Sequence, residues 1–394
     1  MEQMKFEQGD LQQEAPKRIK KRQPPRRRLR ALAVVAAAVL AVVAAFVLLD
    51  RTAFDGLRRS IAYMQAEKDE SGCARLFQYS SDGSSRYADL NGSLLVASAN
   101  EITLLADKGN AVYHTALQFS QVALSAADGQ AAVYEIGGRT LYLLNSRGLV
   151  QQMDLEGDIF AVQMGQGGRF AVTLKKTGYK TTVSVYNGKG EPLYDFNSAQ
   201  SYLLTAAVSE NGKYMAAAAM SQDNGSFVSS LQIYKLTSET MAAEGTLEGG
   251  VYEMGTVGGR FCAATDKALY FVKTDGTVTS YDFQGASLSR CGLGADKFAA
   301  VLLENYASGG QTHLAIVNAA GEEISSMAVD SEVLDLSAAG RYLAVLYSNK
   351  LVIYDQKLRE CAVLEDVSSA RRVLMRSDGS AVLAGTNAAS LYLP

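Results

Sequence analysis

The sequence predicts an all-β domain, a β-propeller of eight four-stranded blades, preceded by one transmembrane helix and a short stalk helix. A glycine, one variable residue and an apolar residue recur as a unit along residues 71–394. Successive copies are 37 to 47 residues apart, close to the length of a propeller blade. The same region has short apolar stretches separated by Gly, Asn-Gly and Asp-Gly, which are typical of strands and tight turns.

Residues 1–30 form a basic tail. They contain ten Lys and Arg residues and four acidic ones, whereas the rest of the chain has 28 basic and 37 acidic residues. Few apolar residues and the pair Pro24 and Pro25 predict a disordered cytoplasmic segment. The acidic body lacks the clustered positive charge that nucleic-acid binding requires, so no nucleic-acid partner is expected.

Residues 31–49 are an uninterrupted run of Ala, Val, Leu and Phe. As a helix this run would be roughly 28 Å long, enough to cross a membrane once. Because four arginines between Arg26 and Arg30 precede it, the N-terminus is expected in the cytoplasm and the propeller outside the cell membrane. A cleaved signal peptide is the alternative, which the length of the run and the absence of an Ala-x-Ala site before Asp50 disfavour.

An amphipathic stalk helix is predicted over residues 50–70, where apolar residues recur at intervals of three and four: Phe54, Leu57, Ile61 and Met64. The propeller is expected to occupy residues 71–394.

Eight repeat units are found, each opening one strand and followed by a second. The units open at Gly92, Gly129, Gly168, Gly212, Gly259, Asp296, Gly340 and Gly379, with aspartate in place of glycine in the sixth. The second strands are predicted at Ile102–Leu105, Leu141–Leu144, Val183–Tyr186, Leu231–Tyr234, Leu269–Val272, Leu314–Val317, Leu351–Tyr354 and Leu391–Pro394. Each full unit also has room for an outer strand, as at Glu191–Phe196, and an inner strand, as at Tyr202–Val208.

The two ends of the domain are expected to pair with each other. The last unit stops just after its second strand, whereas residues Arg75–Tyr79 form a spare strand ahead of the inner strand Arg86–Leu90. Pairing of this N-terminal strand with the C-terminal ones would complete one blade and leave only short edges. This arrangement favours eight blades over seven.

The sequence predicts neither a cofactor nor a metal site. His114 and His313 fall in different units, and the four cysteines are too scattered for a metal-binding pair. Buried thiols are the expectation for the cysteines, with a bridge between Cys262 and Cys291 as the alternative. The Asp-Gly and Asn-Gly pairs and the stretch Gly165–Gly168 are interpreted as turns, because no helix start or calcium-loop spacing accompanies them.

Three connections between the paired strands are longer than the others: Lys176–Thr181, Ser221–Ser229 and Glu304–Gln311. Equivalent connections of a propeller leave on one face, where exposed aromatic and polar groups suit a contact with a protein or a glycan. The candidate binding residues in these connections are Tyr179, Lys180, Asn224, Phe227, Asn305, Tyr306 and Gln311. The alternative is that these are tolerated surface insertions.

The basic tail, the apolar run, the short helix and the Gly-Arg-Phe or Gly-Arg-Tyr strand openings together resemble extracytoplasmic propellers of the WD40-like and quinoprotein-like group. In particular they resemble an uncharacterised family of single-pass membrane propellers from clostridial Firmicutes, which implies the fold but no activity. The chain has no tryptophan, so it lacks both the WD dipeptide and the tryptophans that dock quinone cofactors.

We therefore expect a non-enzymatic, membrane-anchored binding or scaffolding propeller that contacts a cell-envelope protein or polysaccharide. A ligand sensor that signals through the transmembrane anchor is the first alternative. An enzyme that acts on envelope glycans with carboxylates at the central opening is the second.

Overall fold

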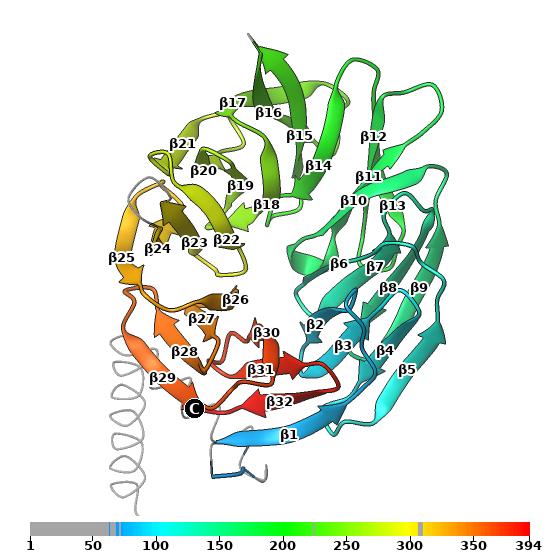
Figure 1. The fold of residues 1–394 in the computed structure, drawn as a ribbon. Helices are drawn as coiled ribbons and strands as arrows, with labels where there is room; N and C mark the ends of the chain where they lie inside the picture. The colour runs from blue at the N-terminus through cyan, green and yellow to red at the C-terminus, as the bar shows by residue number, and fades with distance from the viewer. Residues whose placement is uncertain (1–62, 64–67, 71, 224, 306–309) are drawn as a thin grey trace, which may run out of the picture. The chain divides into compact units, whose positions relative to one another are not determined.

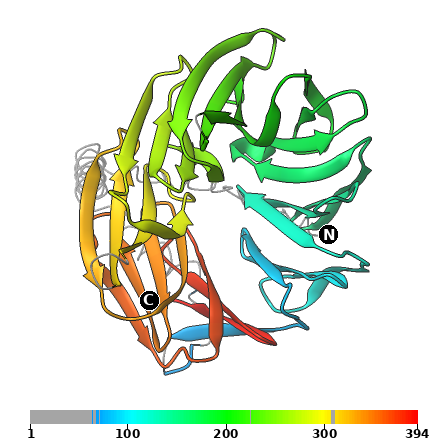
Figure 2. The ribbon, with the colours of Figure 1, turned by 45° about the horizontal axis from the view of Figure 1, so that its top comes forward.

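The computed structural model describes residues 63, 68–70, 72–223, 225–305 and 310–394. These residues form 32 strands in eight four-stranded antiparallel sheets, which surround a common axis (Figures 1 and 2). One 3₁₀ turn, η1 (Gln166–Gly168), also occurs in this part of the chain. The predicted propeller of eight four-stranded blades is confirmed.

The first four blades each use four successive strands, ordered from the axis outward. Blade 1 consists of β2 (Arg86–Leu90), β3 (Ser93–Ala97), β4 (Glu101–Leu105) and β5 (Ala111–Ala116). Blade 2 consists of β6 (Val122–Ala127), β7 (Gln130–Glu135), β8 (Thr140–Asn145) and β9 (Gly148–Asp154). Blade 3 consists of β10 (Asp158–Met164), β11 (Phe170–Lys175), β12 (Thr181–Tyr186) and β13 (Pro192–Ser198). Blade 4 consists of β14 (Tyr202–Val208), β15 (Tyr214–Asp223), β16 (Ser226–Lys235) and β17 (Met241–Glu248).

The next three blades follow the same order, and the last one borrows its outer strand from the start of the domain. Blade 5 consists of β18 (Val251–Val257), β19 (Arg260–Thr265), β20 (Ala268–Val272) and β21 (Val278–Asp282). Blade 6 consists of β22 (Ser287–Gly292), β23 (Phe298–Asn305), β24 (Gln311–Asn318) and β25 (Glu323–Val329). Blade 7 consists of β26 (Val333–Ala339), β27 (Tyr342–Tyr347), β28 (Lys350–Asp355) and β29 (Glu360–Glu365). Blade 8 consists of β30 (Ala370–Met375), β31 (Ala381–Gly385), β32 (Ala388–Tyr392) and β1 (Cys73–Gln78).

The second and third strands of the blades are apolar along most of their length because both of their faces are buried. All five residues of β3 are buried, as are the first five of β11, whereas the outer strand β13 alternates between exposed and partly buried residues. The core is divided accordingly. Among the described residues, eight apolar clusters are found, one between each pair of neighbouring blades. Each blade is therefore held by the two beside it.

The repeated glycines lie in the turns that join the first strand of each blade to the second. All seven have positive φ, between 58° and 100°. At Gly340 an added Cβ would also lie 3.1 Å from Cα of Ser377 in the next blade, so this turn needs glycine for space as well as for conformation. The sixth unit uses Asp296, whose backbone carbonyl accepts from Gly258 N at 3.1 Å and whose N–H donates to Gly340 O at 2.9 Å.

The ring closes as predicted, through pairing of β1 with β32. The Tyr79 hydroxyl adds a hydrogen bond to Gly385 O at 2.8 Å, and Nε of Arg376 in blade 8 donates to Asp89 of blade 1 at 2.8 Å. One predicted strand was misplaced. The third strand of blade 8 is Ala388–Tyr392 and not Leu391–Pro394, because the small residues of 388–390 pair in the sheet without adding an apolar signal.

The predicted tail (1–30) and transmembrane helix (31–49) lie outside the described residues, as does most of the predicted stalk helix (50–70). Where the end of that stalk is described, Lys68 forms a β-bridge with Ala74 and Asp69 starts a turn, so the helix does not continue through residues 68–70. Within residues 63, 68–70 and the described parts of 72–394, no helix is both long and apolar enough to cross a membrane.

Candidate binding face

The three long connections occupy equivalent places in the fold. They join the second strand to the third in blades 3, 4 and 6, between β11 and β12, β15 and β16, and β23 and β24. All of them therefore leave the sheets at the same end, which is also where the chain passes from each blade to the next. We call this end the loop face.

The connection in blade 4 is a strand extension and not the loop that the sequence predicted, whereas in blade 6 only the ends of the predicted connection lie in the strands. The β15–β16 ladder continues to the pair of Asp223 and Ser226, which places Phe227 inside β16 opposite Gln222. The β23–β24 ladder ends with Asn305 opposite Gln311. The ladder is formed by backbone groups, so polar residues can extend it. The apolar pattern in the sequence therefore ended before the strands did. Asn224 and Tyr306 lie outside the described residues.

The third connection, in blade 3, borders a hollow of about 380 Å³. Both candidate residues of this connection, Tyr179 and Lys180, line the hollow. The hollow is completed by two aromatic side chains that the sequence did not single out, Phe160 of β10 and Tyr202 of β14, with Lys175 at the end of β11. The three aromatic residues are 41 % (Phe160), 45 % (Tyr179) and 58 % (Tyr202) exposed. Exposed aromatic groups that gather in one place usually mark a contact surface.

Local backbone features bring these side chains to the surface. The register of β10 against β11 shifts between Ile159 and Ala161, so Phe160 is the extra residue of a β-bulge. Ile159 remains fully buried, and the bulge presents its neighbour to solvent. Tyr202 is the first residue of β14, and Gly178 turns the chain ahead of Tyr179 with a φ of 92°.

The hollow is cationic as well as aromatic. The Lys180 ammonium lies 5.1 Å from the centre of the Tyr202 ring and donates to Gln200 O at 2.7 Å, so the loop is fixed by its own polar contacts. Lys175 adds a second positive charge, and no carboxylate is among the residues that line the hollow. A cation beside an aromatic face can hold a polar or anionic partner while the rings supply apolar contact.

Phe160 and Tyr202 had a weak signal in the sequence. Ile159 and Phe160 are two large apolar residues in succession on an inner strand, a break in alternation that indicates a bulge. Tyr202 was assigned only to a strand, because nothing local shows that it lies beside residues 175–180.

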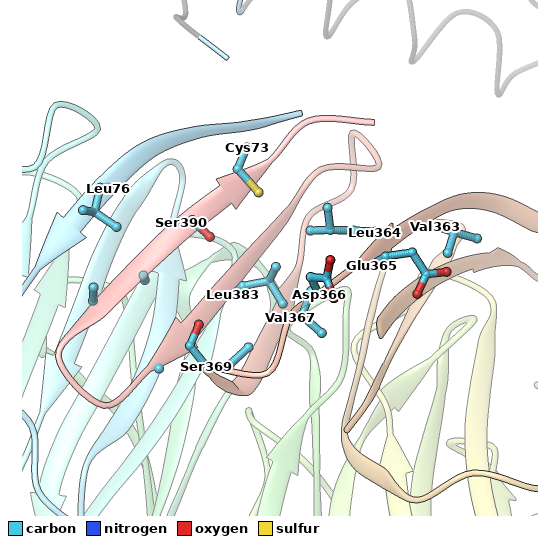
Figure 3. A pocket seen from close by; sticks show the side chains of 14 residues that line it. Cys73, Leu76, Val363, Leu364, Glu365, Asp366, Val367, Ser369, Leu383 and Ser390 are labelled. Atoms are coloured by element: carbon cyan, nitrogen blue, oxygen red, sulfur yellow. The ribbon is translucent and has the colours of Figure 1, made fainter. Parts of the chain in front are cut away.

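A larger hollow, of about 540 Å³, lies between blades 7 and 8 (Figure 3). Leu76 of β1 and Val363 of β29 border it and are 61 % and 39 % exposed, and Glu365 and Asp366 supply its charges. It has no aromatic lining and no basic side chain. The smaller hollow is therefore the better candidate for a binding site, because its lining is aromatic and basic, although its volume is smaller.

The described residues contain no group of three or more His, Cys, Asp or Glu side chains placed to hold a metal ion. His114 lies on the outer strand β5, with Nδ1 3.2 Å from the Thr103 hydroxyl, and His313 lies on β24 of blade 6, so the two fall in different blades as predicted. The Asn and Asp oxygens of the turns accept from nearby backbone N–H groups, for example Asn211 from Lys213 at 3.0 Å. These side chains therefore stabilise the turns in which they lie.

The acidic and thiol groups also have local roles. Hydrogen bonds from Ser326 and Tyr281 hold the pKa of Glu323 below its ordinary value. None of the four cysteines is bonded to another, and burial raises the thiol pKa of both Cys262 and Cys291, which contact the same apolar cluster between blades 5 and 6. Both thiols are protonated at neutral pH, and a protonated thiol is a poor nucleophile and metal ligand.

Comparison with known proteins supports the fold and leaves the activity open. The profile of a family of unknown function (DUF5711) matches residues 70–362. The C-terminal WD40 domain of Sif2 is 11 % identical with a TM-score of 0.51, over 81 % of this chain and 95 % of that one. BamB from Moraxella catarrhalis is 12 % identical with a TM-score of 0.50, over 80 % and 99 %. The dihydro-heme d1 dehydrogenase NirN, in complex with DHE, is 15 % identical with a TM-score of 0.51, over 76 % and 74 %. No curated protein sequence matches.

Proposed function

This chain belongs to the family of unknown function DUF5711, and we propose that it is a non-enzymatic binding or scaffolding propeller that holds its partner on the loop face. The hollow of Phe160, Tyr179, Lys180 and Tyr202 is the observation that carries the proposal. Three exposed aromatic rings from blades 3 and 4 converge there beside a fixed cation. Binding surfaces commonly concentrate their energy in a few such aromatic anchors.

The proposal includes the placement that the sequence predicts. An apolar run at 31–49 and a basic tail would anchor the chain once in the cell membrane, with the propeller outside. The partner would then be a cell-envelope protein or polysaccharide. The packed ring supports this role, because Phe160 and Tyr202 lie on strands and the loop of Tyr179 and Lys180 is held by its own contacts, so binding does not have to order a flexible segment.

Site-specific photo-crosslinking in the full-length protein, in native membranes, tests the proposal. The crosslinking residue is placed at Tyr179 and, separately, at Tyr202. The matched control is Lys189, an exposed residue of the β12–β13 turn at the opposite end of the same blade. We expect one species to be captured at both test sites and not at the control, and capture at Tyr179 to fall when Tyr202 and Lys180 are replaced by alanine. Equal capture at Lys189, or none at either test site, would contradict the proposal.

Two further measurements separate this role from a sensor or an enzyme. Exchange of residues 31–49 for an unrelated membrane anchor should leave a scaffold active, whereas a sensor that signals through the anchor would fail. Turnover of envelope polymer by the purified protein would show that it is an enzyme.

A further inference from the structure

The inner strands of six successive blades carry a β-bulge in the same place. In blades 3 to 8 the register against the second strand shifts one residue near the start of the inner strand. The residues that directly follow the shift are Ala161, Thr205, Glu253, Arg290, Asp335 and Arg372. The last four blades thus place acid, base, acid and base at equivalent positions of neighbouring inner strands.

At this position, blade 7 contacts blade 8 directly. Asp335 Oδ2 in blade 7 accepts from Val373 N of blade 8 at 2.9 Å, and Asp335 Oδ1 lies 3.4 Å from Arg372 Nη1. Arg290 occupies the matching position in blade 6, next to blade 7 in the ring. Burial raises the pKa of Asp335 above its ordinary value, and the hydrogen bond from Val373 N and the charges of Arg372 and Arg290 offset only part of this rise. Asp335 therefore lies between two arginines.

The two guanidinium groups are not fully satisfied by protein groups. Arg290 Nε is buried and has no hydrogen-bond partner among the described residues. The Arg372 side chain is 50 % exposed and has one long contact with Asp335. Across blades 6 to 8, one carboxylate at this position thus stands beside two guanidinium groups. Buried guanidinium N–H groups normally have a partner, and an oxyanion is the partner that their planar fork fits best.

We propose that Arg290 and Arg372 form a binding site for an oxyanion, a phosphate or carboxylate group, at the inner strands of blades 6 to 8. Asp335 is the positioning residue: it is anchored by Val373 N and sets the spacing between the two guanidinium groups. The site is formed by different blades from the aromatic hollow and does not depend on the function proposed for that hollow.

Titration of the full-length protein with inorganic phosphate and with acetate, at constant ionic strength, tests the site. Arg290→Gln and Arg372→Gln are each expected to weaken binding at least tenfold, whereas Arg290→Lys, which retains the charge, loses less. Arg139→Gln is the matched control, because Arg139 is exposed, lies between the second and third strands of blade 2 and is already paired with Asp158 at 2.9 Å. Thermal unfolding checks that each variant is folded.

A second arm separates a free anion from one carried by a polymer. Soluble poly(glycerol phosphate) is titrated in parallel, and tighter binding per phosphate than inorganic phosphate identifies a polymer ligand, whereas equal binding identifies a small anion. Either result supports the site, provided that it depends on Arg290 and Arg372. Undetectable binding of all three probes, or equal loss in the Arg139 variant, would overturn the proposal.

Discussion

Glu253 shows how the surroundings of one residue set its chemistry. It follows the bulge of β18, and although its side chain is partly open to solvent, desolvation by the surrounding protein raises the pKa of its carboxyl group from the ordinary value of 4.5 to about 7, with no hydrogen bond or opposite charge from the described residues to offset this. Its charge and the burial of Cys291 together raise the pKa of that thiol. A carboxyl group that titrates near neutrality changes charge within the range of ordinary buffers.

Replacement of Glu253 by Gln is expected to change how stability depends on pH. The folded state binds the proton more tightly than the unfolded state, so stability falls as pH rises from about 4.5 to about 7 and stays reduced above that. The variant lacks this loss and should be about 1 kcal/mol more stable than wild type at pH 8, a value discounted because solvent reaches the side chain. At pH 4 the two should be equal. Denaturant unfolding at both pH values measures this, and a difference that does not vary with pH would contradict it.

At the scale of elements, the sequence predicts strands well where their two faces are buried. The third strands of seven blades lie where their apolar pattern placed them, whereas β32 was displaced because Ala388, Ala389 and Ser390 carry no such pattern. The turn glycines were found because only positive φ explains their recurrence.

The candidate site could be predicted only in part. Tyr179 and Lys180 were found because their connection is long, but Phe160 and Tyr202 come from other strands and meet them only in three dimensions. The alternation of Glu253, Arg290, Asp335 and Arg372 was not visible either. Their spacing along the chain varies, and only the register of each inner strand shows that they are equivalent.

The closing strand β1 allows a direct test at this scale. Phe77 is fully buried between blades 8 and 1, whereas its neighbour Leu76 is 61 % exposed. Phe77→Ala should lower the free energy of unfolding by about 3 to 4 kcal/mol, because it leaves a cavity where the ring closes. Leu76→Ala should change it by less than about 0.5 kcal/mol. Denaturant unfolding of both variants checks this, and equal effects would mean that β1 contributes little to closure.

For the whole molecule, stability depends on closure because no blade has a core of its own. Each apolar cluster is shared by two neighbours, so a ring that opened between blades 8 and 1 would expose both faces of the cluster between them. The first and last strands of the propeller, β1 and β32, meet at this junction, where the backbone links blades 8 and 1 only by running from β1 to β2. Contacts across it should therefore matter more than equivalent contacts elsewhere in the ring.

The ion pair of Arg376 and Asp89 spans this junction and is the most buried among the described pairs. Its side chains are 8 % and 15 % exposed, whereas Arg139 and Asp158, which join blades 2 and 3, are 62 % and 41 % exposed. Arg376→Met leaves the Asp89 carboxylate without its partner and should cost about 3 kcal/mol, whereas Arg139→Met should cost less than about 1 kcal/mol. Adding Asp89→Leu to Arg376→Met should restore much of the loss, because no unpaired charge then remains. Unfolding of the four proteins in denaturant measures each step, and an equal cost for both single variants would show that the closing junction is no more sensitive than the others.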